Sequence, residues 1–261
     1  MKKILYATDY SENSVPALRF SYALSKELDA ELMVLHVFEL QLTLETTFSH
    51  SYSREQIRTF ANHREKLISF CSQHLQNEPQ PLKITWKIDE GHPTPDTIIE
   101  NAMELDADII VVGSNSGNRE RGNFLGSTTS ELMNLAPCPV LAIPNDTDFH
   151  GFKKIVYATN FERFDIFSIQ KMVNLAQTFK ASIHLIQVTT KETDISEDQM
   201  NWFKNVLRHK VGYGDIQFDL RYGEDVFETL QMYISEIDPD LVAMLEHEDH
   251  NHVKSSPSQS S

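Results

Sequence analysis

The residues of this sequence that could bind a charged ligand lie in one glycine- and hydroxyl-rich segment, VVGSNSGNRERGNFLGSTTSELM, residues 111–133. Gly113 ends an apolar run, and Gly126 stands where a helix-like stretch begins. A glycine lets the backbone approach an anion closely. Ser127 and Thr128 would add hydroxyl groups beside the free N–H groups of a helix start, a combination that favours phosphate. The alternative is a plain flexible connection between a strand and a helix.

The elements that would position this segment follow from the alternation of short apolar runs and amphipathic stretches. Strands are predicted at residues 3–8, 30–37, 82–88, 107–113 and 137–144, and helices at residues 11–28, 53–75, 95–106 and 127–136. Nearly continuous apolar strands that alternate with helices indicate a parallel sheet covered on both faces. The first half of the chain is therefore predicted to be a doubly wound, Rossmann-like α/β domain.

Such a sheet gathers the carboxyl ends of its strands at one crevice, where ligands bind. Asp9, Val37 and Gly113 each fall at the end of a predicted strand. A nucleotide would suit this arrangement, with its phosphates on the loop and helix start and its base near Val37. Asp9 would accept a hydrogen bond from a ribose or base donor.

The chain also repeats itself. Residues 2–37 align without a gap to residues 153–188, and residues 91–112 align in the same way to residues 223–244. Two collinear matches indicate a tandem duplication joined by a polar, turn-rich linker. The expected domains are residues 1–145 and a truncated copy at 152–246, which ends after its fourth strand. Residues 247–261 are too poor in apolar side chains to fold and are expected to form a disordered tail.

Charge and composition exclude several classes of protein. The chain has 261 residues and a formal net charge of -15, which argues against nucleic acid and anionic membranes as partners. Its longest apolar runs fall short of the roughly 20 residues that span a bilayer, and its N-terminus is a poor secretory signal. Cys71 and Cys138 do not suggest a disulfide framework, so a cytoplasmic location is expected. Trp86 and Trp202 have apolar neighbours and are expected in the core.

Four stretches of the sequence together resemble the universal stress protein family: KKILYATDYSENS, MVLHV, ADIIVVGSNSG and APCPVLAIP. The resemblance covers the first copy and most of the second, so the chain is similar to tandem members of that family. It implies two adenine nucleotide alpha hydrolase-like domains. It also implies that Asp9 and Val37 match the acidic residue and the adenine-contacting position of nucleotide-binding members.

In those members the loop follows the pattern Gly-x2-Gly-x9-Gly-Ser/Thr and binds ATP. Counting from Gly113 places Ser116 at the second glycine, Gly126 at the third and Ser127 at the hydroxyl position. The spacing is kept, but the middle glycine is replaced by serine. The hydroxyl of Ser116 could take the place of a backbone contact.

The second copy departs further from the family pattern. Asn160 replaces the acid, Gln187 stands where His36 stands in the first copy, and Leu245 takes the place of Gly113. A nucleotide site is therefore expected in the first domain alone. Any ATP hydrolysis should be slow, because only Arg119 and Arg121 could supply positive charge to the loop.

Two functions remain open from the sequence, and a third, a genuine ATPase, is disfavoured. One is a stress-response sensor or adaptor that binds ATP or a related adenine nucleotide, with or without Mg²⁺, and changes the surface that it offers to a protein partner. The other is an interaction protein without nucleotide, in which Ser116 marks a lost site. A catalytic His36 and a metal site among His247, His250 and His252 are both disfavoured. Two arrangements of the edge strands follow: the strand CPVLAIP covers the free edge of the second copy within one chain, or two chains pair through their CPVLAIP strands. The second arrangement, a homodimer of tandem chains, is expected.

Overall fold

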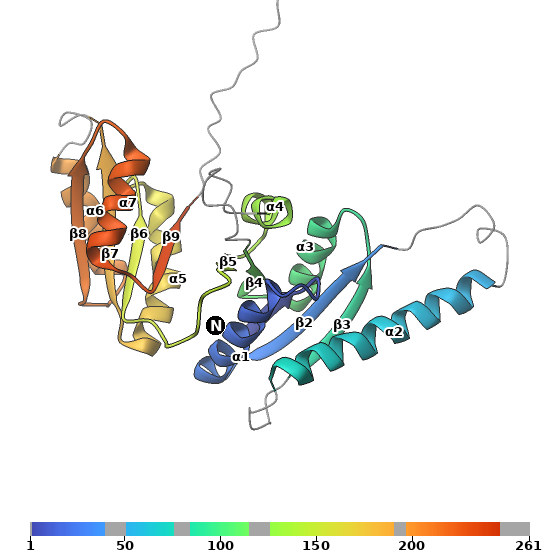
Figure 1. Ribbon diagram of the computed structural model, residues 1–261. Coiled ribbons are helices and arrows are strands. Elements are labelled where there is room, and N and C mark those ends of the chain that lie inside the picture. Colours follow the sequence, from blue (N-terminus) through green and yellow to red (C-terminus); the bar gives the residue numbers. More distant parts are fainter. Residues whose placement is uncertain (1, 40–50, 76–83, 115–125, 191–196, 246–261) are drawn as a thin grey trace, which may run out of the picture. The chain divides into compact units, whose positions relative to one another are not determined.

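The chain folds into two compact units, residues 1–151 and 152–261. The computed structural model describes residues 2–39, 51–75, 84–114, 126–190 and 197–245 (Figure 1). Within this part of the chain, no helix is both long enough and apolar enough to cross a membrane.

The first unit is a five-stranded parallel sheet in the order β3-β2-β1-β4-β5. Its elements are β1 (Lys3–Ala7), α1 (Ser14–Leu28), β2 (Glu31–Phe38), α2 (Ser51–His74), β3 (Ile84–Glu90), α3 (Thr94–Leu105), β4 (Ile109–Gly113), α4 (Ser127–Leu135) and β5 (Val140–Ile143). Alternate strand residues face opposite sides of the sheet. Leu5, Leu35 and Ile110 pack against α3 and α4 on one face, and α1 and α2 contact the sheet and each other. The predicted doubly wound α/β fold is confirmed.

The second unit is a four-stranded parallel sheet in the order β8-β7-β6-β9. Its elements are β6 (Lys154–Ala158), α5 (Arg163–Phe179), β7 (Ser182–Thr189), α6 (Glu197–Lys210), β8 (Ile216–Tyr222), α7 (Val226–Ile237) and β9 (Leu241–Met244). The strand order is that of the first unit without its last strand. Among the described residues, nothing corresponds to α4 and β5.

The strand registers of the two units repeat each other. Ile4 on β1 lies opposite Leu32 on β2, and Ile155 on β6 lies opposite Ile183 on β7. The two pairs differ by the 151 residues that separate the aligned N-terminal segments of the two copies. Conserved register on both sides of the central strand shows that the repeat in the sequence is a repeat in the fold.

Local backbone features recur at the same places. Left-handed backbone occurs at three matching pairs of residues: Tyr10 and Phe161 in the turns after β1 and β6, Asp29 and Lys180 at the ends of α1 and α5, and Asp106 and Asp238 at the ends of α3 and α7. Hydrogen bonds recur as well. The Lys3 ammonium donates to the last turn of α3 and the Lys154 ammonium to the last turn of α7, each at 2.8 Å. The second unit therefore keeps the helix ends and connections of the first.

The two tryptophans differ from each other in their surroundings. Trp86 is partly buried on β3, whereas Trp202 on α6 is 39% exposed. The guanidinium of Arg163 lies 5.5 Å from the centre of the Trp202 ring. The prediction of a core position is wrong for Trp202, because Phe203 and Leu207 form the buried side of this helix.

Candidate functional site

The candidate site lies where the order of the first sheet reverses. β1 and β4 are neighbours, but the chain leaves β1 toward β2 on one side and leaves β4 toward β5 on the other. At such a switch point the connections diverge and leave a crevice beyond the carboxyl ends of the two strands. Ala7 and Gly113 end these strands and open the crevice.

A pocket of about 370 Å³ occupies this position. It is lined by Ala7, Thr8, Asp9, Ser11, Asn13, Ser14, Val37, Thr94, Ile98, Val112, Gly113, Gly126, Ser127, Thr128 and Thr129. Six of the seven residues that the sequence suggested are therefore in one pocket. The seventh, Ser116, lies outside the described residues, as do Arg119 and Arg121.

Hydrogen bonds fix the turn that carries Asp9. The Asp9 carboxylate accepts from the backbone N–H of Ser11 at 2.9 Å, and it has a second oxygen with which to accept from a ligand. Thr8 accepts from the N–H of Tyr10 at 3.0 Å and donates to the hydroxyl of Ser14 at 2.9 Å. The Asp9 side chain is exposed at the pocket, and the residues on either side of it are fixed by these hydrogen bonds. The backbone position of Asp9 therefore does not depend on a ligand.

Gly113 is required for packing. A Cβ atom built at Gly113 would lie 2.5 Å from the carbonyl oxygen of Asn13 and 3.2 Å from the Cα atom of Ser14. The space that we expected an anion to use is filled by the start of α1. Gly113 therefore serves the close approach of β4 and α1, a role that the sequence analysis did not foresee.

Gly126 makes no such close approach to the described residues. It is the N-cap of α4 with an extended backbone (φ −68°, ψ 162°), and a Cβ atom there would meet no described atom within 4 Å. Any residue could adopt this backbone. A residue without a side chain leaves the start of α4 open, and the first turn of α4, Ser127 to Thr129, lines the pocket.

Two helix starts meet in this pocket, since α1 begins at Ser14 and α4 begins at Ser127. Neither N-cap residue makes a side-chain capping hydrogen bond to its helix. At the start of α1, the N–H groups of Ser14 and Val15 donate to the carbonyl groups of Ser11 and Glu12 at 3.0 and 3.2 Å. The first N–H groups of a helix lack partners within the helix, and the helix dipole adds partial positive charge there. The start of α4 can therefore attract an anion, although the described lining contains no Lys or Arg.

Part of the pocket lining is apolar. Val37 and Ile98 line it together with Val112, and all three belong to the packed cluster between the sheet and α3. Hydrophobic contacts with a few polar groups at one end are typical of small-molecule sites. The pocket can thus take a ligand that has one anionic end and one flat apolar end.

Sequence reasoning missed the contribution of the β1–α1 turn. Ser11, Asn13 and Ser14 line the pocket, and the side-chain amide of Asn145 donates to the Asn13 oxygen at 2.6 Å. The stretch SENS, residues 11–14, was placed in the predicted helix 11–28 and given no part in the site. It also follows a central strand, and this position could have indicated a second helix start at the crevice.

His36 is outside the pocket. It is 7% exposed, its Nδ1 lies 2.7 Å from the Thr8 carbonyl oxygen, and its ring stacks on those of Tyr10 and His63. Burial lowers the pKa of His36 from its usual 6.5 to about 4, and the nearby His63 and Lys66 add to the effect. His36 is therefore a neutral packing residue, with its side chain on the α2 face of β2.

The matching place in the second unit holds a carboxylate. Asp165 occupies the position of Ser14, is 1% exposed, and accepts from the hydroxyls of Tyr157 at 3.0 Å and Thr159 at 2.7 Å. Leu245 stands in place of Gly113. A buried acid at a helix start opposes a bound anion, so this unit lacks the features of the first pocket.

No group of three or more metal-ligating side chains occurs in the described parts of the chain. His247, His250 and His252 lie beyond the last described residue, Leu245.

Comparison with known proteins agrees with the fold and the resemblance. Residues 1–144 match the model of the universal stress protein family. Two universal stress proteins of Methanocaldococcus jannaschii are each 28% identical, over 144 residues (54% of this chain and 81% of the relative) and over 153 residues (54% and 94%). A universal stress protein structure from Archaeoglobus fulgidus superposes with a TM-score of 0.68 at 17% identity, covering 93% of this chain and 86% of that one. The chain belongs to the universal stress protein family.

Proposed function

We propose that the first unit binds ATP or a related adenine nucleotide and that the protein acts as a stress-response sensor or adaptor. The observation that carries this proposal is the start of α4, behind Gly126, in a pocket at the switch point of the sheet. Anion binding at helix starts and ligand binding at switch points are both general properties of such folds.

Each part of the pocket has a role in this proposal. The start of α4, with Gly126, Ser127 and Thr128, would hold the phosphates. Val37 and Ile98 would contact the base, and Asp9 would accept from a ribose hydroxyl. Mg²⁺, if it accompanies the nucleotide, would offset phosphate charge in a pocket whose described lining contains no Lys or Arg.

The same lack of cations favours a binding protein over an enzyme. Phosphoryl transfer is accelerated by positive charge placed on the transferring group. Hydrolysis by this unit would therefore be slow. Bound nucleotide would instead act by changing the charge and shape of the surface around the start of α4, which a protein partner could read.

We propose a single nucleotide per chain. The second unit keeps the fold but has Asp165 at the helix start, and a buried carboxylate repels phosphate. Its role in this account is interaction with other proteins.

Two chains are proposed to pair through β5. This strand pairs with β4 on one side, and no strand of the described parts of the chain pairs with its other side. An apolar edge strand can satisfy its free backbone groups against an identical strand across a two-fold axis. The two cysteines, both free, fit our placement of the protein in the reducing cytoplasm.

The alternative is an interaction protein that has lost its ligand. Release of nucleotide from the purified protein distinguishes the nucleotide-binding function from this alternative. The chain is purified without added nucleotide and denatured, and the supernatant is analysed by chromatography for adenine compounds. We expect an adenine nucleotide from the intact chain and a much smaller amount from Asp9→Ala. If neither nucleotide release nor binding of added ATP is found, the alternative is correct.

A further inference from the structure

The second unit has an apolar face that is exposed among the described residues. In the first unit, the equivalent face is covered by two elements of that unit. In the first unit, α4 packs against α3 and β5 pairs with β4. The buried residues Pro95 and Ala102 on α3 and Ile110 and Val112 on β4 correspond in the second copy to Phe227 and Ile234 on α7 and to Val242 and Met244 on β9. We term these four residues of the second unit the α7–β9 face. Among the described residues, no helix or strand covers it.

The exposed fractions of equivalent residues differ strongly between the two units. Ile110 and Val112 on β4 are 0% and 6% exposed, and the residues at the same register of β9, Val242 and Met244, are 36% and 64% exposed. Phe227 is 63% exposed. Contiguous exposed apolar patches of this kind mark interaction sites.

The strand edge beside this face is also free. Ile110 and Val112 lie opposite Val140 and Ala142 of β5, whereas β9 is the last strand of its sheet. Its outer N–H and C=O groups can pair with an added strand, the mode by which many proteins bind extended peptides. The first unit shows the shape of the occupant, which is a helix followed by a parallel strand.

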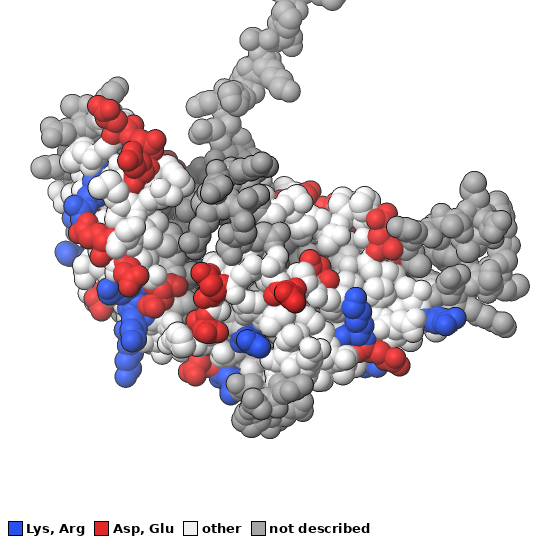
Figure 2. Space-filling model, viewed as in Figure 1, with Lys and Arg blue, Asp and Glu red and all other residues white. Residues whose placement is uncertain are grey.

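The charge around the face selects the occupant. Between residues 222 and 245 the chain has six acidic side chains, all exposed, and no Lys or Arg: Glu224, Asp225, Glu228, Glu236, Asp238 and Asp240. Of the neighbouring bases, Arg221 pairs with Glu236 at 3.1 Å and the Lys154 ammonium donates to the carbonyl of Ile237. Red side chains outnumber blue ones on much of the surface in Figure 2.

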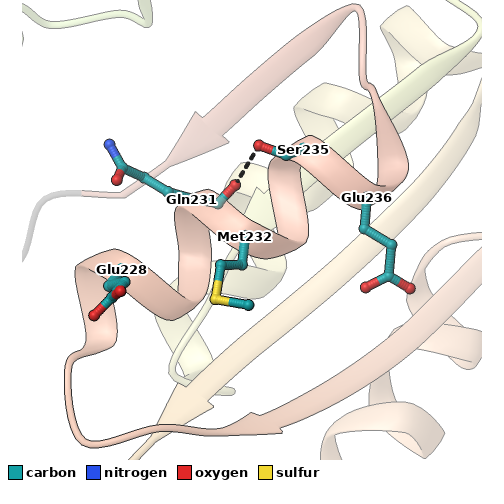
Figure 3. Close-up of a pocket in the computed structure, with 5 residues that line it drawn as sticks. All are labelled: Glu228, Gln231, Met232, Ser235 and Glu236. Atoms are coloured by element: carbon teal, nitrogen blue, oxygen red, sulfur yellow. Dashed lines mark hydrogen bonds between the residues drawn. The ribbon is translucent and has the colours of Figure 1, made fainter.

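The solvent-exposed side of α7 also combines acidic and apolar side chains. A hollow of about 640 Å³ is lined by Glu228, Gln231, Met232, Ser235 and Glu236. Figure 3 shows the 68%-exposed Met232 side chain between those of Glu228 and Glu236. Flexible methionines adapt to different partners, and flanking glutamates favour partners that carry Lys or Arg.

Two other occupants fit less well. A second copy would bring the same acidic residues together, at a cost in repulsion. The chain's own last residues, EHEDHNHVKSSPSQSS, contain three acids and one aliphatic side chain, Val253, which is too little to cover the face. We therefore propose that the α7–β9 face binds a basic amphipathic helix–strand segment of a different protein.

A labelled peptide tests this proposal on the full-length chain. The probe has the sequence of residues 126–144, which forms α4 and β5, with lysine at the exposed positions 130 and 134. A second peptide has glutamate at both positions. We expect fluorescence anisotropy to show saturable binding of the lysine peptide, at least about tenfold tighter than the glutamate peptide and weakened by salt.

Two matched variants locate the binding. Phe227 and Phe164 are each the second residue of a helix in the same unit, 63% and 69% exposed. Phe227→Glu should weaken binding of the lysine peptide at least about tenfold, and Phe164→Glu should leave it unchanged.

Other results would overturn the proposal. These are an absence of peptide binding up to about 100 µM, equal effects of the two variants, or equal affinity for the two peptides. A fall from dimer to monomer mass on Phe227→Glu alone would assign the face to a second copy. A large loss of thermal stability on Phe227→Glu alone would mean that the chain itself covers the face.

Discussion

At the residue scale, the two glycines of the pocket differ in what surrounds them. A side chain at Gly113 would strike the backbone of Asn13, whereas a side chain at Gly126 would meet no atom of the described residues within 4 Å. The first glycine is explained by the fold. We propose that the second leaves room for a ligand in front of α4.

Stability measurements should separate these two roles. Gly113→Ala should lower the free energy of unfolding by about 1–3 kcal/mol, because backbone must move to admit the methyl group. Gly126→Ala should change it by less than about 0.5 kcal/mol. Urea titration of both variants in the absence of nucleotide provides the comparison. Equal losses would show that Gly126 also has a packing role.

His36 should make stability depend on pH. Its pKa in the folded state is about 4, below its usual 6.5, so between these values the unfolded chain binds more protons than the folded one. Stability should therefore rise with pH from about 4 to 6.5, and level off above this range for this residue. His36→Asn, whose amide can still donate to the Thr8 carbonyl, should flatten the dependence measured by urea titration at several pH values. An unchanged slope in this variant would assign the effect to other groups, such as His63.

At the element scale, each helix start is adapted to what it faces. α1 and α4 begin at an open pocket, whereas α5 begins at the buried carboxylate of Asp165. This carboxylate accepts from two hydroxyls and from the backbone N–H of Glu162 at 3.1 Å. The same place in the fold thus binds a ligand in our proposal for one unit and is closed by a side chain in the other.

Removal of this acceptor should be costly. Asp165→Ala leaves the buried hydroxyls of Tyr157 and Thr159 without their partner, and we expect a loss of about 2–4 kcal/mol in the free energy of unfolding. Asp225→Ala is the matched control, because Asp225 caps α7 at an exposed position. Its loss should be near 1 kcal/mol. Similar losses for the two variants would show that Asp165 is no more than an ordinary helix cap.

Much of this arrangement could be predicted from the sequence, and the reasons are physical. Apolar runs reveal buried strands, and the ends of parallel strands converge, so Asp9, Val37 and Gly113 could be placed at one crevice. The role of Gly113 could not, because its contact with Asn13 depends on how closely α1 packs on β4. Trp202 was misplaced because apolar sequence neighbours do not show which side of a helix faces the sheet.

At the scale of the whole molecule, four strand edges have no partner strand among the described residues, those of β3 and β5 in the first sheet and of β8 and β9 in the second. We assign the edges of β5 and β9 to different partners. β5 carries no acidic residue and suits an identical strand, whereas β9 lies in an acidic region and suits a basic segment. The duplication itself could be read from the sequence. The exposure of the α7–β9 face could not, because it depends on which residues α4 and β5 cover in the first unit.

The mass of the protein in solution tests the first assignment. Light scattering should give about 60 kDa, twice the 30.0 kDa of one chain. Leu141→Lys on β5 should shift the mass toward that of a monomer, because like charges would meet across the two-fold axis. A monomer of about 30 kDa at micromolar concentration for the unaltered chain would rule out pairing through β5.

Calorimetric titration of ATP into the full-length chain tests nucleotide binding by the first unit most directly. We predict saturation at one ATP per chain, with an affinity that Gly126→Val weakens at least about tenfold. The control variant Phe164→Glu, in the second unit, should bind as the unaltered chain does. The proposal would be contradicted by an absence of binding, by two nucleotides per chain, or by an affinity that Gly126→Val leaves unchanged.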